Sequence, residues 1–515
     1  MLKYDYDLFY ERDTDMNIET LIAKLIEYAL NNGLIAAEDA LFTRNRLLEC
    51  LGLTEWNDTE PCSDTMTIDE ILDSINDYAA ENGLITGTNE SRDIFDTKIM
   101  GVLTAFPREV ISKFKADYAV SPKTATDNYF DWNKKTNYVR AGRIAKDLKW
   151  EYPCEYGTLD ITINCSKPEK DPRDIAAAKT AKATAYPKCQ LCIENTGYSG
   201  RIGHPARQNL IPIPMTVHNE DWFFQYSPYG YYNEHCIFFN ASHIPMKIDD
   251  AVFGKLFDII EILPHYIVGS NADLPIVGGS ILSHEHFQGG NYIFPMATAP
   301  VEHEFTMNKF PAVKAGIVKW PMSVIRVSSA DRSQLEKACS HILAAWRGYS
   351  DESVGVYAFS GETPHNTITP IARKNDSEYE CDLVLRNNRT DEERPLGIFH
   401  PNPTLHHIKK ENIGLIEVMG LAVLPSRLKE EMKLLADVLV SKGVAAVRAD
   451  ETLEKHADWV EEFAARNDIT ANNVTEVINK EIGAVFAQVL TDAGVFKRDE
   501  QGSAAFRRFA QLVSE

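Results

Sequence analysis

The spacing of apolar residues changes twice along the chain, and this change constrains the fold more than any other sequence feature. Apolar residues recur at helical spacing over the first hundred residues and again after about Pro425, whereas alternation typical of strands begins near Tyr156. Strands and helices are mixed between these two ends. The sequence therefore predicts an α+β fold with a sheet core and crossover helices, flanked by an N-terminal and a C-terminal helical module.

One stretch near the N-terminus is repeated later in the chain. Residues 28–35 read Tyr-Ala-Leu-Asn-Asn-Gly-Leu-Ile, and residues 78–85 read Tyr-Ala-Ala-Glu-Asn-Gly-Leu-Ile. Each copy follows a helical apolar pattern, and Asn-Gly supplies the left-handed turn that ends a helix. We predict a duplicated helical module over 1–105 that has a supporting or oligomerising role, because it carries no chemical motif.

The middle of the chain alternates between strand and helix patterns. Strands are predicted over 159–163 and 236–239 and along the run from 275 to 294, and Asp249 is expected to cap a helix over 250–261. Mixed elements follow over 354–359 and 380–386. We accordingly expect a catalytic domain over 106–310, a second α+β half over 311–430 and C-terminal helices over 431–515.

Length and charge limit the partners of this chain. Its 515 residues exceed a typical single domain. The net charge of −22 would repel the phosphate backbone of a nucleic acid. No run of eighteen uncharged apolar residues occurs, and the opening residues lack a basic stretch followed by an apolar run. We therefore expect a cytoplasmic enzyme without a membrane span or a nucleic-acid partner.

The most informative motif is the stretch Ser283-His284-Glu285-His286-Phe287-Gln288. Residues two apart share one face of a strand, so a strand here would place His284, His286 and Gln288 in one row. Two imidazoles and an amide in a row are typical of a polar site. The alternative is a half-exposed strand with surface polar residues.

Cysteine spacing adds a second signal upstream. Nine cysteines, an odd number, do not indicate a disulfide framework, and only Cys189 and Cys192 are close enough in sequence to act together. Their Cys-x-x-Cys spacing allows two thiolates to reach one Zn²⁺, with two histidines completing the set. A redox pair is the rival interpretation, but such a pair usually opens a helix, and this one precedes a turn-rich stretch.

Longer stretches point to a known family. The chain resembles the second class of galactose-1-phosphate uridylyltransferases, which belong to the histidine triad superfamily. The resemblance spans almost the whole chain and is carried by residues 95–101, 161–172, 227–229, 281–290 and 406–420. It implies a histidine-triad-like core of mixed or antiparallel sheet, and transfer of UMP from UDP-glucose to galactose 1-phosphate.

The resemblance also assigns roles to residues of the motifs. In the first class of these transferases the motif is His-Pro-His-x-Gln, with the second histidine as nucleophile and the first as a zinc ligand. Carried over, His286 is the nucleophile, assisted by Gln288, and a structural zinc is bound by His284 and by the remaining predicted ligands, Cys189, Cys192 and His243. This chain departs from the first class in having Glu285 in place of proline and Phe287 in place of glycine.

Substrate phosphates and sugar hydroxyls need further ligands. A glycine-broken loop offers Arg201, Arg207 and Asn209 as candidates for phosphate, and Lys167 and Lys170 are weaker candidates. The alternative for this loop is a solvated basic segment. The resemblance suggests Glu417 for sugar hydroxyls, and first-class relatives that act as dimers raise a homodimer as an option.

Two other functions remain open at this point. Hydrolases of the superfamily cleave nucleoside phosphates through the same histidine, but their motif typically ends with histidine where this chain has Gln288. A zinc-stabilised interaction protein with an idle His286 is the third interpretation. Within the transferase interpretation, the acceptor is either galactose 1-phosphate or a related hexose 1-phosphate.

Overall fold

The computed structural model describes residues 17–57, 65–166 and 185–515, which form two compact units. Among these residues, the first unit comprises 17–57, 65–115, 128–142 and 185–211, and the second comprises 116–127, 143–166 and 212–515. The helices α5 (Pro107–Val120), α6 (Pro122–Lys135) and α7 (Ala141–Ile144) each cross a boundary between units. Cys62, Lys167 and Lys170 lie outside the described residues, and the predicted four-part division of the chain stays a prediction.

The repeated sequence stretch forms matching helices in the first unit. Helices α1 and α3 end at Asn32-Gly33 and Asn82-Gly83, where both glycines have a positive φ, of 65° and 71°. Thr67 opens α3 with a capping box, in which Glu70 returns a hydrogen bond to its backbone. The apolar faces of four helices share one core, which runs from Ile18 to Leu103. These helices are α1 (Ile18–Asn31), α2 (Ala40–Leu51), α3 (Ile68–Glu81) and α4 (Asn89–Val102).

The second unit is built on a ten-stranded sheet in which every neighbouring pair is antiparallel. In spatial order the strands are β3 (Ile213–Val217), β4 (Glu220–Tyr226), β5 (Cys236–Asn240), β7 (His286–Gly290), β6 (Ile267–Gly269), β13 (Asn366–Asn375), β14 (Glu378–Asn387), β10 (Val324–Ser329), β9 (Lys314–Val318) and β8 (Val301–Thr306).

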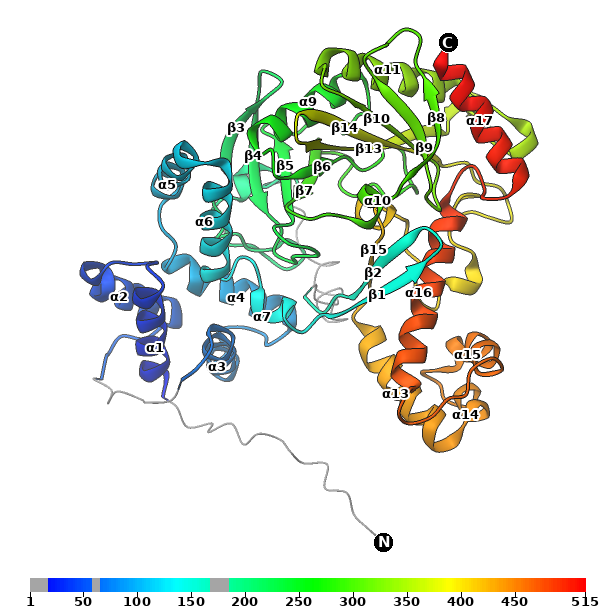
Figure 1. Cartoon of the computed structure of the whole chain (residues 1–515). Coiled ribbons are helices and arrows are strands. Elements are labelled where there is room, and N and C mark those ends of the chain that lie inside the picture. Colours follow the sequence, from blue (N-terminus) through cyan, green and yellow to red (C-terminus); the bar gives the residue numbers. More distant parts are fainter. Residues whose placement is uncertain (1–16, 58–64, 167–184) are drawn as a thin grey trace. The chain divides into compact units, whose positions relative to one another are not determined.

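The two halves of this sheet have the same topology. Each half has five strands. From the outer edge of the sheet inward, they are the first, second, third, fifth and fourth strands of that half in chain order. In both halves a helix lies between the third and the fourth strand in chain order. These helices are α9 (Asp250–Ile262) and α11 (Arg332–Gly348), which pack together on one face and are joined by ion pairs from Arg332 to Asp258 and Glu261 (Figure 1). The halves meet where β6 and β13 pair over two residues.

The other face of the second half is covered by a smaller sheet and by helices. A core that includes Val324, Ile371 and Val384 of the large sheet continues into the small sheet and the C-terminal helices. The small sheet holds β1 (Leu148–Cys154), β2 (Gly157–Ile163) and β15 (Leu421–Leu424), and β11 (Phe359–Ser360) pairs with β12 (Thr363–Pro364). The helices are α10 (Pro295–Thr298), α12 (Leu415–Val418), α13 (Arg427–Lys442), α14 (Val444–Arg448), α15 (Ala457–Ala464) and α16 (Val474–Ala493). Helix α17 (Glu500–Ser514) instead packs against α11 and β8.

The predicted α+β class is confirmed. The predicted strands at 159–163 and 236–239 correspond to β2 and β5, and Asp249 caps α9 by accepting a hydrogen bond from the backbone N–H of Ala251. The predicted strand run from 275 to 294 is wrong for most of its length, because only 286–290 form a strand. Among the described residues, no helix is both long enough and apolar enough to cross a membrane.

A buried ion-pair network joins three strands of the second half. The carboxylate of Asp382, fully buried on β14, accepts hydrogen bonds from Arg326 at 2.7 and 3.0 Å and from Arg373 at 2.8 Å. Burial alone would raise the pKa of the Asp382 carboxyl, but Arg373 and Arg326 lower that pKa below its usual value. Removing one partner of such a network leaves a buried charge without compensation.

We expect Asp382→Asn to lower the free energy of unfolding by about 3–5 kcal/mol, because Arg326 and Arg373 lose the fully buried carboxylate that pairs with both and are left with Glu380. Glu378→Gln is the matched control on the same strand, since Glu378 pairs with the exposed Lys314 at 2.7 Å and such a pair contributes about 1 kcal/mol or less. Denaturant unfolding followed by circular dichroism measures both. Equal losses in the two variants would contradict the prediction.

Candidate active site

Strand β7 begins at His286, so the predicted row of three polar side chains is only partly formed. His286 and Gln288 lie on the strand and share one face, whereas His284 lies in a bend before it. The segment before this bend contains two β-branched residues with positive φ, Ile276 at 60° and Ile281 at 53°. Such backbone is rarely adopted by isoleucine, and it interrupts the alternation that predicted a longer strand.

His286 is buried and has one ring nitrogen assigned by its surroundings. The residue is only 3% exposed, and Nδ1 of its ring lies 2.8 Å from the carbonyl oxygen of His284. A carbonyl can only accept, so Nδ1 carries the proton and Nε2 keeps a lone pair. Burial lowers the pKa of His286 to about 4, so the ring is neutral at physiological pH.

Gln288 is held by a residue that sequence reasoning missed. Its Oε1 lies 3.0 Å from Nε2 of His235, the residue before β5. Nδ1 of His235 is buried and has no partner, so we place the ring proton on Nε2, which donates to Oε1 of Gln288. The amide group of Gln288 is then free to donate elsewhere. No short motif links two residues so far apart in sequence.

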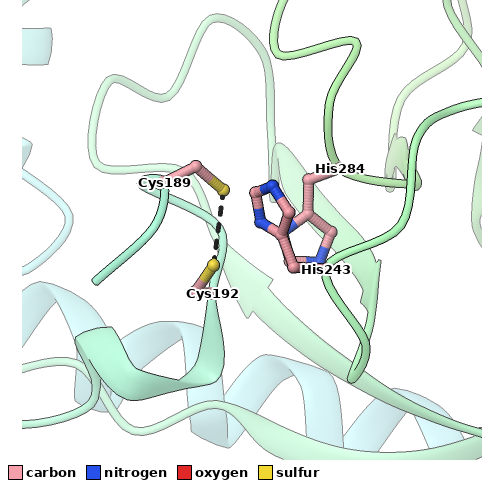
Figure 2. Close-up of side chains that lie close together, drawn as sticks. All are labelled: Cys189, Cys192, His243 and His284. Carbon is pink, nitrogen blue, oxygen red and sulfur yellow. Dashed lines mark hydrogen bonds between the residues drawn. The ribbon is translucent and has the colours of Figure 1, made fainter. Parts of the chain in front are cut away.

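The four predicted metal ligands lie together. Potential ligand atoms of Cys189, Cys192, His243 and His284 are all within 4.8 Å of one another, and Figure 2 shows the two thiols facing the two imidazole rings. The two Sγ atoms are 3.6 Å apart, and the ring centroids of His243 and His284 are 4.9 Å apart. This cluster could hold a metal ion.

The donor set and its spacing fit a tetrahedral ion. Thiolates bound to Zn²⁺ at about 2.3 Å in a tetrahedron would be roughly 3.8 Å apart, close to the separation of the two Sγ atoms here. The second ring nitrogen of His284 also has a partner, because Nε2 donates to the carbonyl oxygen of Asn240 at 2.8 Å. Because this hydrogen bond places the ring proton on Nε2, Nδ1 is the nitrogen of His284 that could bind an ion.

The predicted phosphate-binding arginines have partners within the first unit. Nη1 of Arg201 donates to the hydroxyl of Tyr198 at 2.7 Å, and the guanidinium of Arg207 lies over the ring of Tyr138, with Nη1 donating to the carbonyl of Ala206 at 3.0 Å. Nε of Arg207 is buried without a hydrogen-bond partner. Each arginine therefore keeps donors that are not used in the described residues.

Asn209 and Glu417 are more firmly engaged. Asn209 is buried, and its amide group donates to the carbonyl oxygen of Thr136 at 2.9 Å. One oxygen of Glu417 pairs with the buried Lys409 at 2.8 Å, and the other accepts from the backbone N–H of Gly414 at 3.1 Å, which caps α12. Both side chains thus support local structure.

Glu285 lies between the two histidines and points to the opposite face. Its carboxylate pairs with Lys255 of α9 at 2.7 Å. The ring of Phe287, which follows His286 in the sequence, stacks on Trp222 with centroids 5.0 Å apart. Glu285 and Phe287, which depart from the first-class motif, therefore occupy the helix-covered face, whereas His286 and Gln288 occupy the other.

Family comparisons cover most of this chain. The model of the galactose-1-phosphate uridyl transferase N-terminal domain matches residues 33–245, and that of the C-terminal domain matches residues 259–461. The two matched regions include both histidines of the motif, the Cys-x-x-Cys pair and both sheet halves. The predicted resemblance is therefore confirmed.

Similar proteins match over almost their whole length. The galactose-1-phosphate uridylyltransferase of Fusobacterium nucleatum is 53% identical over 505 residues, covering 97% of this chain and 99% of its own. The enzymes of the same name from Halalkalibacterium halodurans and Bacillus subtilis are 52% and 49% identical, covering 97% and 96% of this chain and 99% and 97% of their own. A crystal structure of yeast Ap4A phosphorylase Apa2 has a TM-score of 0.34 and 11% identity, covering 64% of this chain and 91% of its own.

The site geometry predicts a pH effect on stability. Burial lowers the pKa of His235 from 6.5 to about 4, so the unfolded chain takes up a proton between these pH values and the folded chain does not. The neutral, buried imidazole of His235 therefore makes its full contribution to the free energy of unfolding above about pH 6.5, and this contribution is lost as the pH falls toward 4. As the pH is lowered from 6.5 to 4, we expect the free energy of unfolding to decrease more steeply for the wild type than for His235→Gln. The difference in slope is expected to reach about 1.4 kcal/mol per pH unit.

Urea unfolding at several pH values between 4.5 and 7.5 measures this difference. The comparison of slopes separates His235 from the other buried histidines, which titrate in both proteins. Parallel curves for the two proteins would mean that His235 is charged in the folded state or titrates normally there.

Proposed function

The chain belongs to the galactose-1-phosphate uridylyltransferase family and is a nucleotidyltransferase of galactose metabolism, and on this premise we propose that it transfers UMP through a covalent intermediate on His286. The donor is UDP-glucose and the acceptor is galactose 1-phosphate. The products are glucose 1-phosphate and UDP-galactose. The observation that carries the proposal is the hydrogen bond from Nδ1 of His286 to the carbonyl of His284.

The reaction divides into two substitutions at the same phosphorus. Nε2 of His286 attacks the α-phosphorus of UDP-glucose, a P–N bond forms, and the anhydride P–O bond breaks to release glucose 1-phosphate. A phosphate oxygen of galactose 1-phosphate then attacks the uridylyl phosphorus, and the P–N bond breaks to regenerate the neutral imidazole. One anhydride is exchanged for another, so the reaction is nearly balanced and needs no energy input.

Neutrality and orientation make this imidazole a suitable nucleophile. A protonated ring has no lone pair at Nε2, and burial opposes protonation of His286. The carbonyl of His284 fixes the ring so that Nε2 is the nitrogen without a proton. When the P–N bond forms, the ring becomes positively charged, and the same carbonyl stabilises the charged ring by accepting from Nδ1.

Gln288 is proposed to bind the transferred phosphoryl group. His235 engages Oε1 of Gln288, which leaves the amide hydrogens to donate to a non-bridging phosphoryl oxygen. Glutamine has no proton to give or take at neutral pH, so it cannot activate water as histidine could. This difference favours transfer to a sugar phosphate over hydrolysis.

We propose that the Cys/His cluster binds zinc as a structural ion. Two thiolates and two imidazoles fill four positions, which leaves no place for a substrate. When bound, the ion would fix His284, whose carbonyl orients His286. It supplies no step of the transfer.

The remaining predicted residues are proposed as substrate ligands. Arg201 and Arg207 offer donors for the diphosphate, and Asn209 is proposed to support the loop that carries them. Glu417 is proposed to accept from sugar hydroxyls through carboxylate lone pairs that Lys409 and Gly414 leave free. We propose that the enzyme works in the cytoplasm on free sugar nucleotides, and a homodimer stays a proposal taken from the resemblance.

The covalent intermediate is testable by intact-protein mass spectrometry. We expect incubation with UDP-glucose alone to add one UMP to the wild type through an acid-labile bond, and to add none to His286→Ala. Adding galactose 1-phosphate is expected to remove the label and form UDP-galactose. A panel of other hexose 1-phosphates in place of galactose 1-phosphate tests the acceptor range.

His303→Ala is the matched control, because His303 lies on the edge strand β8 and is expected to leave labelling unchanged. A label on His286→Ala would place the nucleophile elsewhere. Loss of the label in buffer without any acceptor would favour the hydrolase alternative, since water would then be the acceptor.

Metal content is the second test. We expect purified protein to hold about one zinc per chain and Cys192→Ser to hold much less, because a hydroxyl is a poor zinc ligand at neutral pH. Cys50→Ser is the control for loss of a thiol outside the cluster. Elemental analysis after gel filtration measures both, and removal of the metal by a chelator is expected to lower the melting temperature. Equal zinc in Cys192→Ser and wild type would contradict the assignment.

A further inference from the structure

A buried ion pair lies directly behind the proposed nucleophile. Glu285, only 7% exposed, precedes His286, and its Oε1 lies 2.7 Å from Nζ of Lys255, which is 6% exposed. The other carboxylate oxygen accepts from the amide group of Asn240 at 3.0 Å. Nζ of Lys255 also lies 3.0 Å from a carboxylate oxygen of Glu220.

Lys255 occupies an unusual place for a charged residue. It belongs to the buried face of α9, beside Leu256 and near Val252, and Nζ lies 5.4 Å from the centre of the Trp222 ring. Charged groups lose hydration on burial, and an apolar residue of similar size is often neutral or stabilising at such a position. Stability alone therefore gives no reason for an ion pair between this helix and this strand.

The backbone of Glu285 links the ion pair to His286. The N–H of Glu285 donates to the carbonyl of Ile244 at 2.7 Å, and its own carbonyl accepts from the N–H of Asn240 at 3.0 Å. The N–H of Glu285 and the carbonyl of His284 belong to one peptide group, which is planar. Fixing Glu285 therefore fixes the direction of the carbonyl that accepts from Nδ1 of His286.

We propose that Lys255 and Glu285 are positioning residues that hold His286 in line for attack. The ion pair fixes the side chain of Glu285 on the helix-covered face, and the peptide plane transmits this constraint to the imidazole on the other face. Proline restricts the backbone through its ring at the matching position of the first-class motif, and here two side chains from separate elements supply the restriction. This inference rests on the proposed role of His286 as the nucleophile.

The test compares the rate of His286 labelling in single and double variants. We expect Lys255→Met and Glu285→Gln each to lower the single-turnover rate of uridylylation by about 10–100-fold, because a displacement of about 1 Å from the line of attack is costly. The KM for UDP-glucose is expected to change by less than about threefold, since the pair contacts no substrate. Both single variants are also expected to lose stability.

The double variant Lys255→Met with Glu285→Gln separates positioning from general stability. It leaves no buried charge without a partner, because Glu220, the other carboxylate near Lys255, has a side chain that is 43% exposed to water. We therefore expect the melting temperature to recover toward that of the wild type while the labelling rate stays low. The matched controls are Glu220→Gln, which removes the other carboxylate near Lys255, and the exposed Lys314→Met. Both are expected to keep the labelling rate within about threefold of the wild type.

Two outcomes would overturn the inference while leaving the covalent mechanism intact. One is a wild-type labelling rate in both single variants, and the other is recovery of rate together with stability in the double variant. Absence of label on the wild type would overturn the covalent mechanism itself, and the inference with it.

Discussion

Antiparallel pairing on both sides of β7 allows its side chains only two directions. Partners on β5 and β6 fix the strand, so residues alternate between the face covered by α9 and the opposite face. The side chains of His286 and Gln288 point to one face of the sheet, whereas the side chain of Phe287 points to the other face and packs on Trp222. The aromatic packing and the chemistry are therefore set by one register, and a slip of one residue would exchange them.

Burial has two opposite uses around this strand. On the face that holds His286 and Gln288, burial lowers the pKa of His286 and of His235 and so keeps both imidazoles neutral. No carboxylate is among the causes that shift either pKa. On the helix-covered face the buried carboxylate of Glu285 has a lysine and an amide as partners. Neutral groups on one side and a compensated charge on the other let an acidic protein keep the imidazole of His286 unprotonated.

Short sequence patterns correctly predicted those elements whose ends or strands depend on neighbouring residues in the chain. The ends of α1 and α3 follow from Asn-Gly, the start of α9 from Asp249, and β5 from alternation. The segment before His284 alternates in the same way but is irregular, because Ile276 and Ile281 take left-handed backbone that tertiary contacts must stabilise.

For the site, the motifs and the family resemblance predicted the four residues that cluster in the structure as potential metal ligands. They could not identify the partners His235 or Lys255. These residues lie 53 and 30 positions from Gln288 and Glu285 and meet them only after folding.

The matching topologies of the two sheet halves have a mechanical consequence. Each half is tied internally by longer strand pairings, whereas the two are joined edge to edge by only two residue pairs, between β6 and β13. The β6–β13 pairing provides few backbone hydrogen bonds for a sheet of this width. The packing of α9 against α11 therefore provides a second connection between the two halves. A force that pulls the two halves apart would therefore act first on the side chains between α9 and α11. The half that contains His286 would keep its internal strand pairing while the β6–β13 pairing separates.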